Sequence, residues 1–213
     1  MDPISIAIFI FILLFSIIFH EIAHGLMAER LGDTTARDAG RLTLNPVPHI
    51  DLFGSILLPA FLLLVNSPIL FGAAKPVPVD FRNLRNLKWG MILVSLAGPA
   101  TNFLLAIVAA IVFRMLPNIS ELGQGLLIQT ISLNLVLGLF NLIPIPPLDG
   151  SKILASLFGF LDRNWMYMML SLERFGFIIL ILFLYTGLIQ FMIVPPLIFL
   201  LKFLLGPNVP LGL

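Results

Sequence analysis

Two histidines and a glutamate in the first apolar run have the spacing of a metal site. His20 and His24 are four residues apart, so in a helix they share one face, with Cβ atoms about 5–6 Å apart. Glu21 follows His20, and the pattern H-E-x-x-H on a helix is typical of zinc sites in which the glutamate is the general base. The alternative is that these side chains cap a membrane helix or hydrogen-bond to a neighbouring one.

The chemistry that such a site performs is metal-assisted hydrolysis, because zinc lowers the pKa of water to about 7. A catalytic zinc usually takes three protein ligands, so one more is needed. Asp149 is the candidate, since it follows an apolar run that ends in three prolines. Alone, Asp149-Gly150 would favour a simple turn, but beside the histidine motif the carboxylate is better interpreted as a ligand.

The composition places these residues in a membrane. Of 213 residues, 59% are hydrophobic and 11% charged, and mean hydropathy is +1.08. The runs without Asp, Glu, Lys or Arg are 3–20, 52–74, 89–113, 122–148 and 175–201. They predict an all-α polytopic membrane protein of about five to six membrane helices, the last run dividing near 186–187. We expect one membrane-embedded domain, 1–213, with a catalytic core at about 4–152 and C-terminal helices at about 165–206.

The net charge of +1 gives no broad positive potential of the kind that binds nucleic acid, so nucleic acid is not an expected partner. Because the sequence has no cysteine, any metal must be held by histidine and carboxylate. Prolines predict short extended segments near 41–48 and 75–79. The run 52–74 is expected to be re-entrant or broken.

That expectation comes from the topology that the metal site requires. His20 and Asp149 lie late in their runs, so both spans should point the same way, with 89–114 crossing back between them. This layout gathers basic residues on the active-site face, which the positive-inside rule places in the cytoplasm, with Arg114 opposite. They are Arg30, Arg37, Arg41, Lys75, Arg82, Arg85, Lys88, Lys152 and Arg163. We therefore expect a multi-pass protein of the cell membrane.

Several motifs together resemble the site-2 protease family of intramembrane zinc metalloproteases, in its compact bacterial branch without a PDZ or nucleotide-binding domain. Besides H-E-x-x-H, they are N-x-x-P-x-P-x-L-D-G ending at Gly150, Leu44 to Asp51, Ala74 to Val79, and Ala97-Gly98-Pro99-Ala100-Thr101-Asn102. The resemblance covers residues 20–152. It implies one zinc ion per chain bound by His20, His24 and Asp149, with Glu21 as the base.

The resemblance also implies that Asn102 and Asn141 line the site and help to position substrate, although a buried asparagine can simply bond two membrane helices. Because Asp149 fills the third ligand place, His49 is expected to support a ligand or to face substrate, unless it is only a loop histidine.

The function so implied is cleavage of transmembrane segments in other membrane proteins, with extended pieces near 42–45 and 77–79 offering an edge to an unwound substrate. The alternatives are a divalent-metal transporter or channel, and an inactive protease homologue that acts as a membrane chaperone.

Overall fold

The computed structural model describes every residue except 1–2, 58–60, 62–63, 65–73, 117 and 207–213. The described residues form helices joined by irregular segments, without a strand. The longer helices are α1 (Pro3–Arg30), α4 (Leu87–Met115), α5 (Glu121–Asn141), α6 (Asp149–Leu161), α7 (Arg163–Ser171), α8 (Gly176–Tyr185) and α9 (Leu188–Leu205). The short ones are α2 (Thr35–Asp38), η1 (Val47–His49), η2 (Leu52–Leu57), η3 (Phe81–Asn83) and η4 (Leu172–Phe175).

Five helical stretches in the described part of the chain are long and apolar enough to cross a membrane. They are Ile4–Arg30, Leu87–Met115, Glu121–Asn141, Arg163–Tyr185 and Leu188–Leu205. Large apolar side chains on them are exposed, among them Ile10, Leu104 and Phe191. Lipid accommodates such surfaces, whereas water does not. The predicted polytopic, all-α class is confirmed.

Helix α4 is central to the packing, because it contacts α1 on one side and α5 on another. Small side chains on α4, at Ala106, Ala109 and Ala110, pack against buried Ile131 and Leu135 of α5 and three leucines of α9. Small residues let membrane helices approach closely, where dispersion forces hold them together. The C-terminal helix α9 therefore shares a core with the helices that carry the predicted site.

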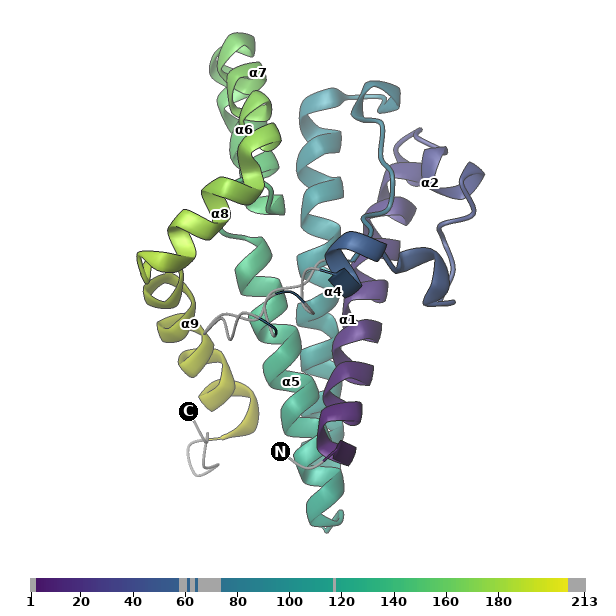
Figure 1. Cartoon of the computed structure of the whole chain (residues 1–213), viewed down its shortest axis with the longest axis vertical. Coiled ribbons are helices and arrows are strands. Elements are labelled where there is room, and N and C mark those ends of the chain that lie inside the picture. The colour runs from purple at the N-terminus through teal and green to yellow at the C-terminus, as the bar shows by residue number, and fades with distance from the viewer. Residues whose placement is uncertain (1–2, 58–60, 62–63, 65–73, 117, 207–213) are drawn as a thin grey trace.

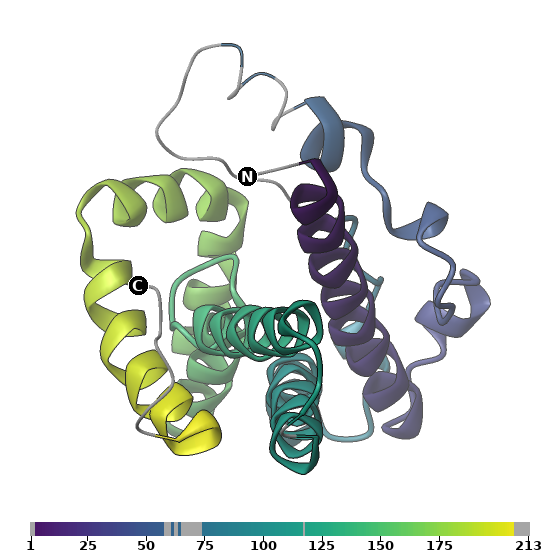
Figure 2. The same cartoon turned by 90° about the horizontal axis from the view of Figure 1, so that it is seen from below.

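The directions of the helices agree with the predicted topology. In Figure 1, α1 and α5 both run upward, while α4 runs downward between them in the sequence. Seen from below in Figure 2, α1, α4 and α5 stand side by side. The backbone N–H of Arg85 donates to Leu31 O at 3.0 Å, which joins the end of α1 to the approach to α4. His20 and Asp149 are thus brought to the same depth.

The break in the last apolar run occurs where it was predicted. Helix α8 ends at Tyr185, α9 begins at Leu188, and Gly187 between them has a φ of 72°. That left-handed conformation costs little for glycine and turns the chain into a new helix.

The polar segments differ in part from the expectation. Residues 41–46 and 75–80 lie outside helices, but residues 47–48 belong to the 3₁₀ helix η1, so the predicted extended segment 41–48 is wrong at its end. Pro48 is compatible with a helical turn near its start, where no N–H bond is needed. For 52–74, the structure describes a π-helical turn at Leu52–Leu57, and the re-entrant or broken path predicted beyond it lies largely outside the described residues.

Candidate metal centre

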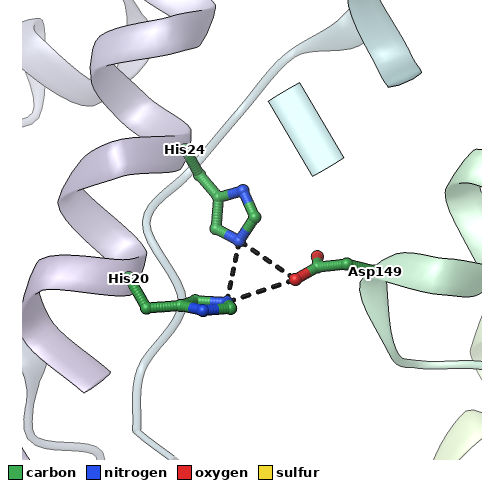
Figure 3. Close-up of side chains that lie close together, drawn as sticks. All are labelled: His20, His24 and Asp149. Atoms are coloured by element: carbon green, nitrogen blue, oxygen red, sulfur yellow. Dashed lines mark hydrogen bonds and ion pairs between the residues drawn. The ribbon is translucent and has the colours of Figure 1, made fainter. Parts of the chain in front are cut away.

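His20, His24 and Asp149 converge although about 125 residues separate the histidines from the carboxylate in the sequence. Asp149 Oδ2 lies 3.2 Å from the Nε2 atom of each histidine, and the two Nε2 atoms are 2.9 Å apart. Figure 3 shows the three side chains pointing at one another from α1 and from the first residue of α6. All three are at most 8% exposed. One ligand atom from each lies within 4.8 Å of the others, so the group could hold a metal ion.

The hydrogen bonds at the Nδ1 atoms of the two imidazole rings determine whether the Nε2 atoms carry a hydrogen or a lone pair. His20 Nδ1 lies 2.6 Å from Asn102 Oδ1, and His24 Nδ1 lies 2.7 Å from Val94 O. Both partners are oxygen acceptors, so each Nδ1 carries the hydrogen and each Nε2 of a neutral ring presents a lone pair.

Three lone-pair atoms therefore face one another: two Nε2 atoms and Asp149 Oδ2. Asp149 Oδ2 is buried and receives no hydrogen bond from the part of the chain that the structure describes. Such a buried cluster of acceptors is costly unless a proton or a metal ion lies between them, and its size suits a metal ion. Two imidazoles and one carboxylate are the donor set of a catalytic zinc, which keeps its fourth position for water.

Gly98 of α4 leaves the room that an ion needs. A Cβ atom built on Gly98 would lie less than 3.0 Å from Nε2 of both histidines, which real Cβ contacts essentially never do. Any larger residue here would occupy the space beside the ligand atoms.

A proline-rich turn and a glycine place Asp149. Helix α5 ends at Asn141, earlier than the apolar run 122–148, because Pro144, Pro146 and Pro147 cannot continue it. A Cβ atom on Gly150 would lie less than 3.0 Å from the carbonyl oxygens of Leu142 and Ile143, so only glycine allows this close return of the chain. Asp149 thus opens α6 instead of closing α5.

Glu21 lies beside the ligand group and is bound to the segment after Lys75. Its Oε2 accepts the backbone N–H of Val77 at 2.7 Å. Arg41 steadies the same segment, since its Nη2 donates to Lys75 O at 2.8 Å and to Pro76 O at 3.3 Å. Because Pro76 and Pro78 have no N–H and the N–H of Val77 is bonded to Glu21, the backbone of residues 76–78 has only carbonyl acceptors left for another partner.

Asp33 anchors the other end of this segment. It is 0% exposed; its Oδ2 accepts the N–H of Asp80 at 2.8 Å, and its Oδ1 accepts from Asn83 Nδ2 at 2.9 Å and from Thr35. Burial by itself raises the pKa of Asp33, but these hydrogen bonds outweigh it and leave the pKa lowered. The carboxylate therefore stays ionised and ties the end of α1 to the approach to α4.

A cavity of about 390 Å³ opens onto the ligand group. It is lined by His20, Glu21, His24, Pro76, Val77, Pro78, Val79, Phe81, Val94, Ser95, Asn141, Pro147, Asp149, Lys152 and Glu173. The sequence placed Lys152 on the active-site face but not at the ligand group, where its Nζ is 4.0 Å from Asp149 Oδ1; its position three residues after Asp149 was a usable signal. Glu173 was missed altogether: no motif marks it, and its buried Oε1 has no hydrogen-bond partner among the described residues.

The three less certain site residues have different surroundings. Asn102 is 0% exposed and lies behind His20, away from the described lining of the cavity. Asn141 lines the cavity and donates Nδ2 to Leu137 O at 3.0 Å. His49 is outside the described lining: its Nε2 is 2.9 Å from Thr43 O, and its carbonyl accepts the N–H of Lys75. The substrate or supporting roles of Asn141 and His49 stay predictions.

The fold and the site together define a polytopic membrane protein with a buried centre suited to one metal ion. The model of peptidase family M50 matches residues 120–183. YwhC of Bacillus subtilis (strain 168), assigned as a zinc metalloprotease, is 38% identical over 202 residues, which are 91% of this chain and 87% of that protein. The chain belongs to peptidase family M50, the site-2 protease family.

More distant relatives carry similar names. Rip2 of Mycolicibacterium smegmatis, also assigned as a zinc metalloprotease, is 28% identical over 190 residues, 86% of this chain and 70% of that protein. The zinc metalloprotease MJ0392 of Methanocaldococcus jannaschii is 29% identical over 149 residues, 70% of this chain but only 34% of that protein. No solved structure matches the chain.

Proposed function

We propose that this protein is a membrane-embedded zinc metalloprotease that hydrolyses peptide bonds within or near transmembrane segments of other membrane proteins. The observation that carries the proposal is the convergence of three buried lone-pair atoms, from His20, His24 and Asp149, beside the carboxylate of Glu21. Family membership supports the same activity and does not favour the metal-transport alternative.

In this proposal the metal-binding residues and the general base have separate roles in hydrolysis. His20, His24 and Asp149 would hold one zinc ion. When bound, zinc supplies Lewis-acid polarisation of the scissile carbonyl and makes water acidic enough to lose a proton near neutral pH. Glu21 takes that proton from the attacking water and passes it to the departing amine as the C–N bond breaks. Its bond to Val77 N–H engages Oε2 and restrains the carboxylate at the wall of the cavity.

The same proposal covers the whole chain as one catalytic domain, with a core at about 4–152 and C-terminal helices at about 165–206. The packing of α9 on α4 and α5 supports a single unit. We place the protein in the cell membrane with the site toward the cytoplasm. Nine basic residues expected at the site end support that orientation, and Arg114 lies at the other end, where it donates to Leu204 O at 2.8 Å.

Metal removal tests the function directly. The full chain, reconstituted in lipid vesicles with a labelled single-span test protein, should cleave that protein, stop when a zinc chelator has removed the metal, and resume when zinc but not magnesium is returned. Magnesium prefers oxygen ligands, and of the three proposed ligands only Asp149 supplies oxygen. Undiminished cleavage after complete zinc removal would contradict the proposal, and zinc flux into the vesicles without cleavage would favour transport.

A further inference from the structure

A network of hydrogen bonds between buried side chains extends from His20, away from the cavity, and joins three helices. Asn102 of α4 donates Nδ2 to Asn134 Oδ1 at 3.0 Å and to Ser16 O at 3.3 Å. Asn134 of α5 donates Nδ2 to Ser16 Oγ and to Thr130 O, each at 2.9 Å. Asn102, Asn134 and Ser16 are at most 4% exposed. Polar groups at this depth are costly unless bonded, so each contact constrains the others.

The two backbone carbonyls in this hydrogen-bond network determine which way each asparagine amide is oriented. Ser16 O and Thr130 O are backbone carbonyls, which can only accept hydrogen bonds. The NH₂ group of each asparagine must therefore face a carbonyl, and flipping either amide would set two oxygens against each other. With both amides fixed, Asn102 can present only Oδ1 to His20, so His20 Nδ1 carries the hydrogen and Nε2 faces the metal centre.

The two histidines are held by different means. His24 Nδ1 faces Val94 O, a backbone atom that the helix itself orients. His20 Nδ1 faces a side-chain amide, which could present either of its two ends. Only the second arrangement needs other groups to set the amide; Ser16 O and Asn134 Oδ1 both accept from Asn102 Nδ2, and the contact to Asn134 is the shorter at 3.0 Å against 3.3 Å.

We propose that Asn134 is a positioning residue of the metal centre. By accepting from Asn102, it fixes the Asn102 amide and so holds His20 in the tautomer and ring orientation that bind zinc. The proposal rests on the proposed function in taking zinc as the ion, and it extends the centre to a residue of α5 outside the described lining of the cavity.

Asn134→Leu tests the positioning role with zinc affinity as the readout. Leucine has the same number of side-chain heavy atoms and the same branching at Cγ but removes the acceptor, so that, of the two acceptors of Asn102 Nδ2 in the described residues, Ser16 O remains. Groups that orient a ligand histidine typically contribute 10- to 100-fold to metal affinity. We expect zinc affinity of the full chain, measured by chelator competition in detergent, to fall by about tenfold or more. Asn134→Ala removes the same acceptor and replaces leucine if that variant does not fold.

Two matched variants separate positioning from helix packing. Asn134→Asp keeps an oxygen facing Asn102, and the O–H of the neutral buried acid can replace the donation to Thr130 O. Zinc affinity should stay near that of the wild type even though the buried acid lowers thermal stability. Thr130→Val removes the hydroxyl that donates to Leu126 O one turn away on α5, yet leaves the carbonyl that Asn134 uses. It should leave zinc affinity unchanged.

Nitrogen-15 spectra of histidine-labelled, zinc-loaded protein report the tautomer itself, and the chain has only 3 histidines. In Asn134→Leu the Nδ1–H signal of His20 should shift or broaden, while that of His24 stays. Unchanged zinc affinity and spectra in Asn134→Leu, or an equal loss of affinity in Thr130→Val, would overturn the role of Asn134. Wild-type protein that binds zinc but cleaves nothing would instead overturn the proposed function, because neither readout depends on cleavage.

Discussion

We expect Glu21→Gln to slow cleavage of a membrane-embedded substrate by about 10²- to 10⁴-fold, the usual contribution of a general base. Glutamine has the same shape, and its oxygen can still accept the N–H of Val77, so the segment after Lys75 should stay in place. Its NH₂ end cannot take a proton from water. The cleavage rate in vesicles and the zinc content of the purified protein together measure this effect, and zinc should remain at one ion per chain.

Glu29→Gln is the matched control, because it makes the same change on α1 at a residue outside the described lining of the cavity. Glu29 pairs with Arg37 at 2.7 Å near the surface, and an exposed pair contributes little. Its cleavage rate should match the wild type. Wild-type cleavage by Glu21→Gln would remove the proposed base, and loss of zinc from that variant would mean that Glu21 is needed to hold the ion.

The second large effect is expected from Gly98→Ala, a change that adds one methyl group. The new Cβ would crowd both Nε2 atoms, and α4 would have to shift against α1 to admit it. Overpacking of this kind typically costs about 1–3 kcal/mol. The clash is at the two Nε2 atoms, so we expect this cost to fall on the zinc-bound arrangement. Because 1.4 kcal/mol is a factor of ten, zinc affinity should then fall by about 5- to 140-fold, with cleavage falling in parallel at limiting zinc. Chelator competition measures the affinity.

Gly90→Ala provides the comparison for crowding on the same helix. The three atoms nearest to a Cβ on Gly90 belong to the Leu84 side chain, and the closest, Cδ1 at 2.8 Å, is the rotatable end of that chain; Gly90 is outside the described lining of the cavity. Zinc affinity should be unchanged. Equal zinc affinity in Gly98→Ala and wild type would contradict the account of how the ion is accommodated.

The sequence was sufficient for features that depend on local spacing and hydropathy. The four-residue interval of His20 and His24, the charge-free runs and the helix break at Gly187 are all set by neighbours along the chain. The parallel directions of α1 and α5 followed from one added assumption, that Asp149 reaches the histidines.

Features that depend on distant packing were not predictable in the same way. Nothing near Glu173 or Asn134 in the sequence marks a contact with the cavity or with Asn102, because those contacts arise only when the helices assemble. The helix that carries Asp149 was also misplaced: apolar composition continues through 142–148, but the prolines end α5 at Asn141. Hydropathy alone does not distinguish a spanning helix from a buried turn.

The central claim is that His20, His24 and Asp149 together bind one zinc ion. X-ray absorption at the zinc edge of the purified full chain measures this most directly. We expect one zinc per chain, with scattering from two imidazoles at about 2.0–2.1 Å and carboxylate or water oxygen at about 2.0–2.2 Å. Asp149→Ala should lower the oxygen contribution and weaken binding. A spectrum without imidazole scattering, or one that Asp149→Ala leaves unaltered, would contradict binding by these three residues.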